Sequence, residues 1–498
     1  MGNVNRKYFT KNIIKRKALI IVMISILCSL VCFMLAIKNL ELSYQAVFFI
    51  VTMGYIWILK TWNGFYKSYL DPYSVFVVTT YVFYYGQYLL YVIGVPLNSG
   101  KTIVNTYSQG NYNYVSLFIL TAMLLVHIGA LCGILFSKNP YLVVPVDKIK
   151  EEEKNIKADF KALKIIAVFL LIISYIPTLI ILFNYIKIVF SVGYGSVFKS
   201  ELYTSGGFNN ILGFLSTFII PALVSGIIAF KNSKYLNFMY ILTAIYITLY
   251  FLSGSRNNAV SVLFAILLIK KYFIGGINFC SKVKLFIVCP IFITILSLIS
   301  TIRSELCKSA SYGVLVINVL KEMMEENIIF TFLREFGYTL VATTTVFIYC
   351  PEPVEHVYGE TYFASLLKIF PNIFWSVHPA SKVSVDSVFK SFITSNGGIG
   401  SSFIAEAYYN FGCFSLFAMP VIGYLLYKLF AEMNMASKMD KIGVGFLTIY
   451  IFSFILFYIR SDTTSFWRNL IYYGFMPYLM FGLIRNSIKR RISFDECN

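Results

Sequence analysis

The chain has 498 residues, of which 58% are hydrophobic and only 13% are charged. An average soluble protein carries about 25% charged residues, so this composition excludes a soluble enzyme, a disordered scaffold and a fibrous repeat protein. Its 42 lysines and arginines outnumber its 23 aspartates and glutamates, which gives a net charge of +19. The meaning of that charge depends on where along the chain it lies.

In chain order, apolar runs recur at about the 20-residue length that a helix needs to cross a bilayer. They predict an all-α, polytopic membrane protein with about twelve transmembrane helices, near residues 18–37, 44–60, 72–95, 113–136, 164–190, 209–230, 235–253, 257–274, 284–302, 404–430, 442–459 and 466–484. The predicted domains are a membrane domain at 1–302 with nine spans, a long loop at 303–403, a membrane domain at 404–484 with three spans and a basic tail at 485–498. His127 lies inside the fourth run, where we expect a packed core residue with satisfied hydrogen bonds.

The positive charges predict the orientation, because cytoplasmic segments of membrane proteins are enriched in lysine and arginine. Both terminal tails are basic, and so is the connection 137–164, which an even number of spans places on the same side. We therefore expect both termini in the cytoplasm of a bacterial cell and the loop at 303–403 outside the cytoplasmic (inner) membrane. The excess of positive charge is then a topology signal, and no nucleic-acid partner is expected.

The segment 303–403 is far longer than any other connection and is rich in aromatic and branched residues, which favours a functional loop over a disordered one. Apolar residues at helical spacing across 318–349 predict an amphipathic helix on the outer membrane surface. Glu406 then enters the tenth run from outside. A carboxyl group there is costly unless it faces a cavity or a partner.

Four arginines fall at outer helix ends: Arg256, Arg303, Arg460 and Arg468. Guanidinium groups bind phosphate oxygens through paired hydrogen bonds and stay charged at any working pH. The alternative is that each arginine only extends its charged end to the membrane surface. As a group at one membrane depth, they predict a site for a lipid diphosphate.

Several segments in this order resemble the Wzy-type polymerases of polysaccharide repeat units: SGSRNN, REFGYT, VYGETYF, PNIFW, GGIGSSFIAEAYYNFG and RSDTTSFWRN. The resemblance covers about 250–475, and the earlier residues match only as membrane spans. It implies a membrane glycosyltransferase that joins oligosaccharides carried on undecaprenyl diphosphate, at the outer face of the membrane, into a capsule, an O-antigen or another surface glycan. Membrane lipid, a chain-length regulator and a flippase are the further partners that it suggests.

This chemistry requires a general base for the acceptor hydroxyl and positive charge for the leaving diphosphate. We expect His378 and Glu406 as the catalytic residues, with Glu335 and Asp462 as further acceptor-side candidates. Trp375 and Tyr408 are expected to stack on sugar rings. No Asp-x-Asp pair stands in the outer loop, so arginines are expected to take the place of a metal ion, and no cofactor is predicted.

Two other functions fit the same membrane architecture. An O-antigen ligase would use the same donor chemistry to move a finished glycan onto a lipid A core. A flippase or other transporter of lipid-linked oligosaccharide belongs to a different class. Transporters place charged residues near the membrane midplane and often consist of two related halves. Here the charged residues gather at the outer helix ends, which favours outer-face chemistry.

Overall fold

The computed structural model describes residues 2–38, 42–97, 102–137, 153–192, 208–253, 257–275, 328–370, 378–393, 400–438 and 441–495. Within these ranges the chain forms helices and no strands, as the sequence predicts. The first part contains α1 (Gly2–Ile37), α2 (Tyr44–Tyr66), α3 (Pro72–Val92), α4 (Gln109–Phe136), α5 (Glu153–Val192), α7 (Phe208–Ser216), α8 (Ile219–Ala229), α9 (Leu236–Leu252) and α10 (Asn257–Tyr272).

The second part is made of shorter pieces. It contains α13 (Ile328–Phe336), α14 (Tyr338–Tyr349), α15 (Glu360–Leu367), α16 (Pro379–Val383), α17 (Val385–Phe389), η4 (Lys390–Phe392), α18 (Phe403–Phe411), η5 (Gly412–Ala418), α19 (Met419–Lys438), α20 (Ile442–Tyr458), η6 (Thr463–Ser465), α21 (Phe466–Arg468), the π-helix η7 (Asn469–Phe475) and α22 (Met476–Asp495). The predicted run at 404–430 is divided because Gly412 adopts a positive φ of 55°, which ends α18.

Among the described residues, seven helical stretches are long and apolar enough to cross a membrane: Asn12–Ile37, Tyr44–Tyr66, Pro72–Val92, Gln109–Phe136, Ile156–Val189, Ile211–Ala229 and Phe403–Lys438. The runs near 235–253 and 442–459 form the shorter apolar helices α9 and α20. The run near 284–302 lies outside the described residues. The chain is thus polytopic, and the number of twelve spans stays a prediction.

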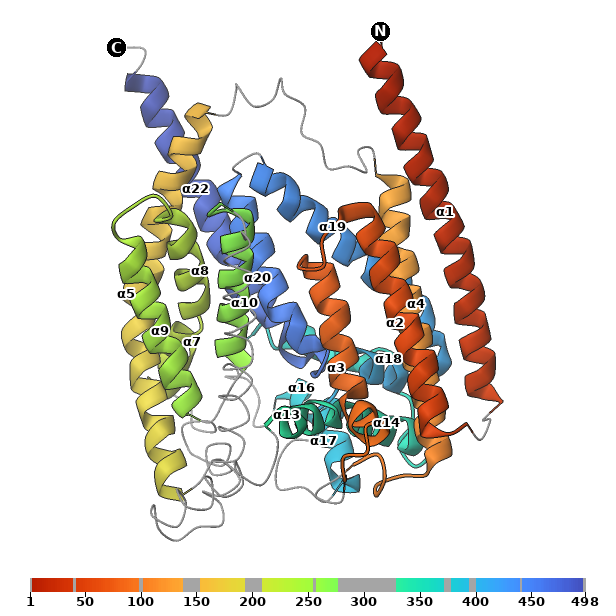
Figure 1. The fold of residues 1–498 in the computed structure, drawn as a ribbon. Coiled ribbons are helices and arrows are strands. Elements are labelled where there is room, and N and C mark those ends of the chain that lie inside the picture. Colours follow the sequence, from red (N-terminus) through yellow and green to blue (C-terminus); the bar gives the residue numbers. More distant parts are fainter. Residues whose placement is uncertain are drawn as a thin grey trace.

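Both ends of the described chain lie at the same end of the helix bundle, where α1 begins and α22 finishes (Figure 1). The short helices α13, α14, α16 and α17 lie at the opposite end, at the bottom of the view. The segment that the sequence predicts to be an outer loop is therefore separated from the basic termini by the length of the bundle.

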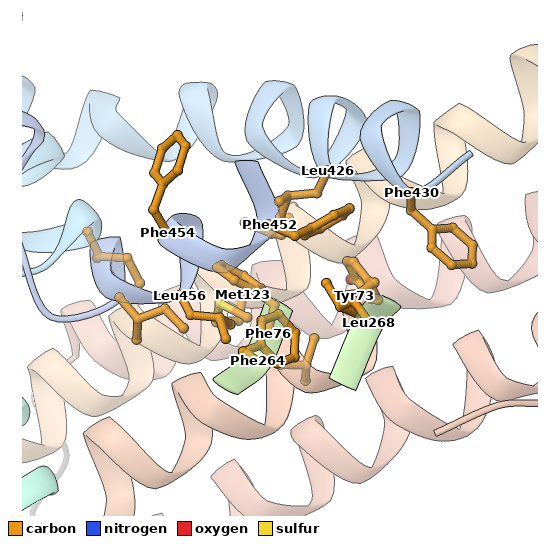
Figure 2. Close-up of a cluster of buried hydrophobic side chains, with 14 of the residues drawn as sticks. Tyr73, Phe76, Met123, Phe264, Leu268, Leu426, Phe430, Phe452, Phe454 and Leu456 are labelled. Atoms are coloured by element: carbon orange, nitrogen blue, oxygen red, sulfur yellow. The ribbon is translucent and has the colours of Figure 1, made fainter. Parts of the chain in front are cut away.

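The apolar core lies where α3, α4, α10, α19 and α20 meet. Figure 2 shows side chains from all five helices turned toward one another, including Tyr73, Met123, Phe264, Leu426 and Phe452. Such a core fixes the relative positions of the helices that lead into the short elements at the lower end.

Glycines let α4 and α19 approach closely. A Cβ atom at Gly129 would lie 1.9 Å from the carbonyl oxygen of Pro420, and one at Gly423 would lie 1.8 Å from that of Val126. Real side chains never make such contacts, so backbone packs directly on backbone here. Small residues at helix interfaces serve this purpose in membrane proteins.

A histidine and an ion pair inside the bundle show how buried polar residues find partners there. His127 is fully buried, and its ring nitrogens lie 2.8 Å from Thr61 Oγ1 and 3.0 Å from the Tyr73 hydroxyl. This confirms the prediction of a satisfied core histidine. Arg485 on α22 forms an ion pair with the buried Asp159 on α5.

The prediction of a surface helix across 318–349 is wrong for its second half. Residues 318–327 lie outside the described part, and Gly337 separates α13 from α14. The α13 side chains from Phe330 onward are half-buried against α3, whereas most of α14 is buried between α3, α4 and α18. Threonines made α14 look like a surface helix, but Thr339, Thr343 and Thr345 are buried and form hydrogen bonds; Thr345 donates to the Val341 carbonyl at 2.9 Å.

Candidate functional site

Five short elements meet at the end of the bundle away from the termini. Helix α15 contacts α16, α18, η6 and α21, which come from three separate stretches of the chain. We call this meeting point the carboxyl site, after the two acidic side chains at its centre, Glu406 and Asp462.

Glu406 lies in the first turn of α18, which Ser402 caps by accepting a hydrogen bond from Ala405 N at 3.0 Å. Its side chain is fully buried. Thr463 donates to both carboxyl oxygens, with its amide at 2.8 Å from Oε2 and its hydroxyl at 2.6 Å from Oε1. Glu406 therefore ties the start of α18 to the turn that follows α20.

A second set of bonds connects α18 to the start of α15 and to the glycine that precedes it. Asn410 Nδ2 donates to Thr361 Oγ1 and to the Glu406 carbonyl, both at 2.7 Å, and Asn410 Oδ1 accepts from Gly359 N at 2.8 Å. The Thr361 hydroxyl also interacts with the Glu406 side chain. The start of α15 is thus held against α18 by these polar contacts together with the stacking of Tyr362 on Phe411.

Asp462 caps η6 through a bond from Thr464 N to Oδ1 at 3.2 Å, and its Oδ2 accepts from Val385 N at 3.2 Å. The side chain keeps 8% of its surface exposed. Because it precedes Thr463, it lies beside Glu406, and the two carboxyl groups interact electrostatically. Its hydrogen bonds are longer than those of Glu406, so its carboxyl group is held less tightly.

Two cations lie at this site: Lys368, which interacts with Asp462, and Arg468, which lies near Lys368. Lys368 follows α15 and is half-buried. Burial lowers the pKa of its ammonium group, the negative charge of Asp462 raises that pKa, and the positive charge of Arg468 lowers it further. Arg468 ends α21 and is also half-buried. The site thus combines a lysine and an arginine with the two carboxyl groups of Glu406 and Asp462.

His378 caps α16, with its Nδ1 accepting from Ala380 N at 3.2 Å. Burial lowers the pKa of the imidazole, the nearby cations Lys368 and Arg468 lower it further, and the Leu367 carbonyl opposes them. The ring is therefore neutral near pH 7, and one of its nitrogens is already used by the cap.

The remaining sequence candidates lie elsewhere. The guanidinium carbon of Arg460 lies 5.5 Å from the centre of the Phe336 ring on α13. Arg468, in contrast, lies near Lys368, which follows α15. Glu335 is half-buried on α13. Tyr408 stacks on Phe347 of α14 with 3.6 Å between ring centres, so its ring contributes to the core. The predicted site residues Arg256, Arg303 and Trp375 lie outside the described residues.

Sequence reasoning missed Lys368, Thr463 and Asn410. Lys368 stands in the apolar run LLKIF, and an isolated lysine in such a run is a signal that could have been used. No comparable signal marks Thr463 or Asn410, whose roles depend on contacts across the fold. Across the ranges that the structure describes, no group of three or more histidine, cysteine or acidic side chains is placed to hold a metal ion.

The comparisons give one match. The family model of the O-antigen polysaccharide polymerase Wzy covers residues 18–491. No curated protein and no protein of solved structure matches the chain. The matching family is a polymerase family and neither a ligase nor a flippase family. The chain therefore belongs to the O-antigen polysaccharide polymerase family Wzy and is a multi-pass membrane protein that polymerises repeat units by glycosyl transfer.

Proposed function

We propose that this polymerase joins oligosaccharide repeat units carried on undecaprenyl diphosphate, at the carboxyl site. The observation that carries the proposal is the grouping of Lys368 with Asp462 and Arg468. Lys368 follows α15, which contacts α16 and α18, and Figure 1 shows these two helices toward the bundle end opposite the termini. The grouping is the combination that transfer from a lipid diphosphate needs: positive charge for the leaving group and a carboxylate for the acceptor proton.

In the proposed reaction, the acceptor hydroxyl attacks the anomeric carbon of the donor sugar. A new glycosidic bond forms as the bond from that carbon to the diphosphate oxygen breaks, and the acceptor proton moves to Asp462. Arg468 and Lys368 stabilise the charge on the departing lipid diphosphate; Arg468 can do so with two parallel hydrogen bonds.

The two carboxyl groups have different proposed roles. Glu406 was the first acidic candidate from the sequence, but both of its oxygens accept short hydrogen bonds from Thr463. Asp462 is more exposed and more loosely bonded, so we assign it the contact with the acceptor hydroxyl. Glu406 is then the partner that holds the turn carrying Asp462. His378 positions α16 beside the cations.

The proposed orientation places the carboxyl site at the outer face and both termini in the cytoplasm. Its support is the basic character of the two tails together with their shared end of the bundle. Of the arginines outside the carboxyl site, Arg256, Arg303 and Arg460 stay candidates for contacts with the same lipid diphosphate or with a second one.

The test is polymerisation of a synthetic undecaprenyl-diphosphate repeat unit by the purified protein in liposomes. We expect a ladder of products from the wild type. Arg468→Ala should slow it about 30- to 1,000-fold, corresponding to about 2–4 kcal/mol of lost transition-state stabilisation. Arg468→Lys should recover part of the rate.

Lys382→Gln is the matched control, because Lys382 is an exposed cation on α16. It should polymerise normally. An unchanged repeat unit with the wild type, or a normal ladder from Arg468→Ala, would overturn the proposal.

A further inference from the structure

Helix α15 has two contrasting faces. Thr361, Ala364 and Ser365 are buried, toward the carboxyl site. Phe363 is 72% exposed, and Leu366 and Leu367 are exposed beside it. This is the reverse of a helix on a soluble protein, because these three small residues face inward and the large apolar residues face outward.

The apolar face continues past the end of the helix. Backbone bonds from Ile369 N to Leu366 O at 3.1 Å and from Phe370 N to Leu367 O at 3.0 Å add a further turn. Phe370, which is 56% exposed, is seven residues after Phe363 and so lies on the same side. The Tyr472 hydroxyl donates to the Ile369 carbonyl at 2.7 Å and holds this turn on η7. The exposed residues Phe363, Leu366, Leu367 and Phe370 are called the α15 ledge below.

The ledge leads directly to the cations. Lys368 belongs to the same turn, yet it is half-buried and lies near Asp462 and Arg468. A row of large apolar side chains about 10 Å long, at 1.5 Å per residue, thus ends beside two positive charges. The ligand that matches this pattern is an amphiphile with a hydrocarbon chain and an anionic head.

We propose that the α15 ledge binds the hydrocarbon chain nearest the head of a polyprenyl diphosphate, with the diphosphate at Lys368 and Arg468. The inference rests on the proposed function and adds the place where the lipid part of the substrate enters: from the side of the protein, along α15. The hydrocarbon chain of the lipid covers the apolar face of α15, while the opposite face of the same helix keeps its contacts with the carboxyl site. The chemistry favours a lipid over a sugar on the ledge, because the four ledge side chains carry no polar atoms.

Binding of undecaprenyl diphosphate without any glycan is the experiment that tests this. Native mass spectrometry of the full-length protein in detergent gives the affinity, and inorganic diphosphate is the headgroup probe. Phe363→Gln combined with Phe370→Gln removes the ledge's aromatic contacts; we expect about 10- to 100-fold weaker binding of undecaprenyl diphosphate and unchanged binding of inorganic diphosphate. Lys368→Gln should weaken the binding of both.

The matched control is Phe414→Gln combined with Phe417→Gln, an equally exposed aromatic pair on η5. It should bind both probes like the wild type. An equal loss in this control would show general lipid adhesion, and wild-type affinity in the ledge variant would show that the chain lies elsewhere; either result overturns the inference. If the double ledge variant fails to fold, Phe370→Gln alone gives the same comparison.

The two proposals fail separately. Tight, ledge-dependent binding of undecaprenyl diphosphate by a protein that makes no ladder would retain the lipid site and overturn the proposed function. If the ledge variant makes the ladder at the wild-type rate and binds undecaprenyl diphosphate with wild-type affinity, the proposed function stands and the inference about the ledge is overturned.

Discussion

Replacement of Asp462 by asparagine separates the chemistry of the carboxyl site from its architecture. Asparagine caps helices as well as aspartate does, so the bond from Thr464 N to Oδ1 can persist. The amide group that replaces Oδ2 cannot accept the bond from Val385 N at 3.2 Å. Leaving one buried donor without its partner costs about 1–3 kcal/mol of folding free energy.

The expected effect on the reaction is larger. A general base contributes about 10²- to 10⁴-fold to a rate, which corresponds to about 3–5 kcal/mol of activation free energy. Asp462→Asn should therefore lower the initial rate of polymerisation in liposomes by two to four orders of magnitude, while the protein still reaches the membrane and shows only a modestly lower melting temperature in detergent.

Two further variants make this result interpretable. Glu406→Gln can keep both contacts to Thr463, because its oxygen accepts from the amide and its amino group donates to the hydroxyl; we expect less than about a tenfold loss of rate, since no base is removed. Glu360→Gln changes an exposed acid on α15 and should have no effect. A rate within about threefold of the wild type for Asp462→Asn, or a far larger loss for Glu406→Gln, would refute the assignment of Asp462 as the base.

Two more predictions concern the supporting structure. The pKa of His378 is lowered from 6.5, so its contribution to stability is fully present above pH 6.5 and is lost as the pH falls and the ring protonates. The hydrogen-exchange protection factors of the amides in 380–383, each taken relative to the intrinsic rate at the same pH, should fall below pH 6.5, and His378→Asn should remove this dependence. Protection factors that do not change with pH in the wild type would contradict it. Gly423→Ala forces α19 away from α4 and should destabilise the protein by about 1–3 kcal/mol or more in a thermal unfolding assay. Gly482→Ala is the control, because nothing lies within 4 Å of the added Cβ atom, and it should not destabilise the protein. Equal melting temperatures for the two variants would contradict the close packing.

The sequence predicted the features that depend on composition and length. Apolar runs are a direct consequence of the bilayer's thickness, so α1 to α4 appear where the runs lie. His127 was correctly predicted as a core residue because a polar group inside an apolar run requires a partner.

The features that depend on contacts between distant segments could not be predicted. Periodicity identifies a helix but does not say which helices cover it, so the pattern at 318–349 predicts a surface helix although α3, α4 and α18 enclose α14. Lys368 and Asp462 are separated by more than 90 residues, and no local sequence pattern indicates that they lie close together in the fold. The same holds for Asn410, whose three hydrogen bonds all cross to other parts of the fold or to its own preceding turn.

The short elements around the carboxyl site explain why its acidic residues have both structural and chemical roles. Helices of five to nine residues are not stable alone in water, so α15 to α18 hold their places through contacts with one another. Many of those contacts are polar: Glu406 to Thr463, Asp462 to Val385 and Asn410 to Gly359. A substitution to alanine at either carboxyl residue would therefore loosen the elements that carry the cations, and a loss of activity would say nothing about proton transfer. Amide replacements, which keep an oxygen acceptor in place, are the ones that can assign the chemistry of this site.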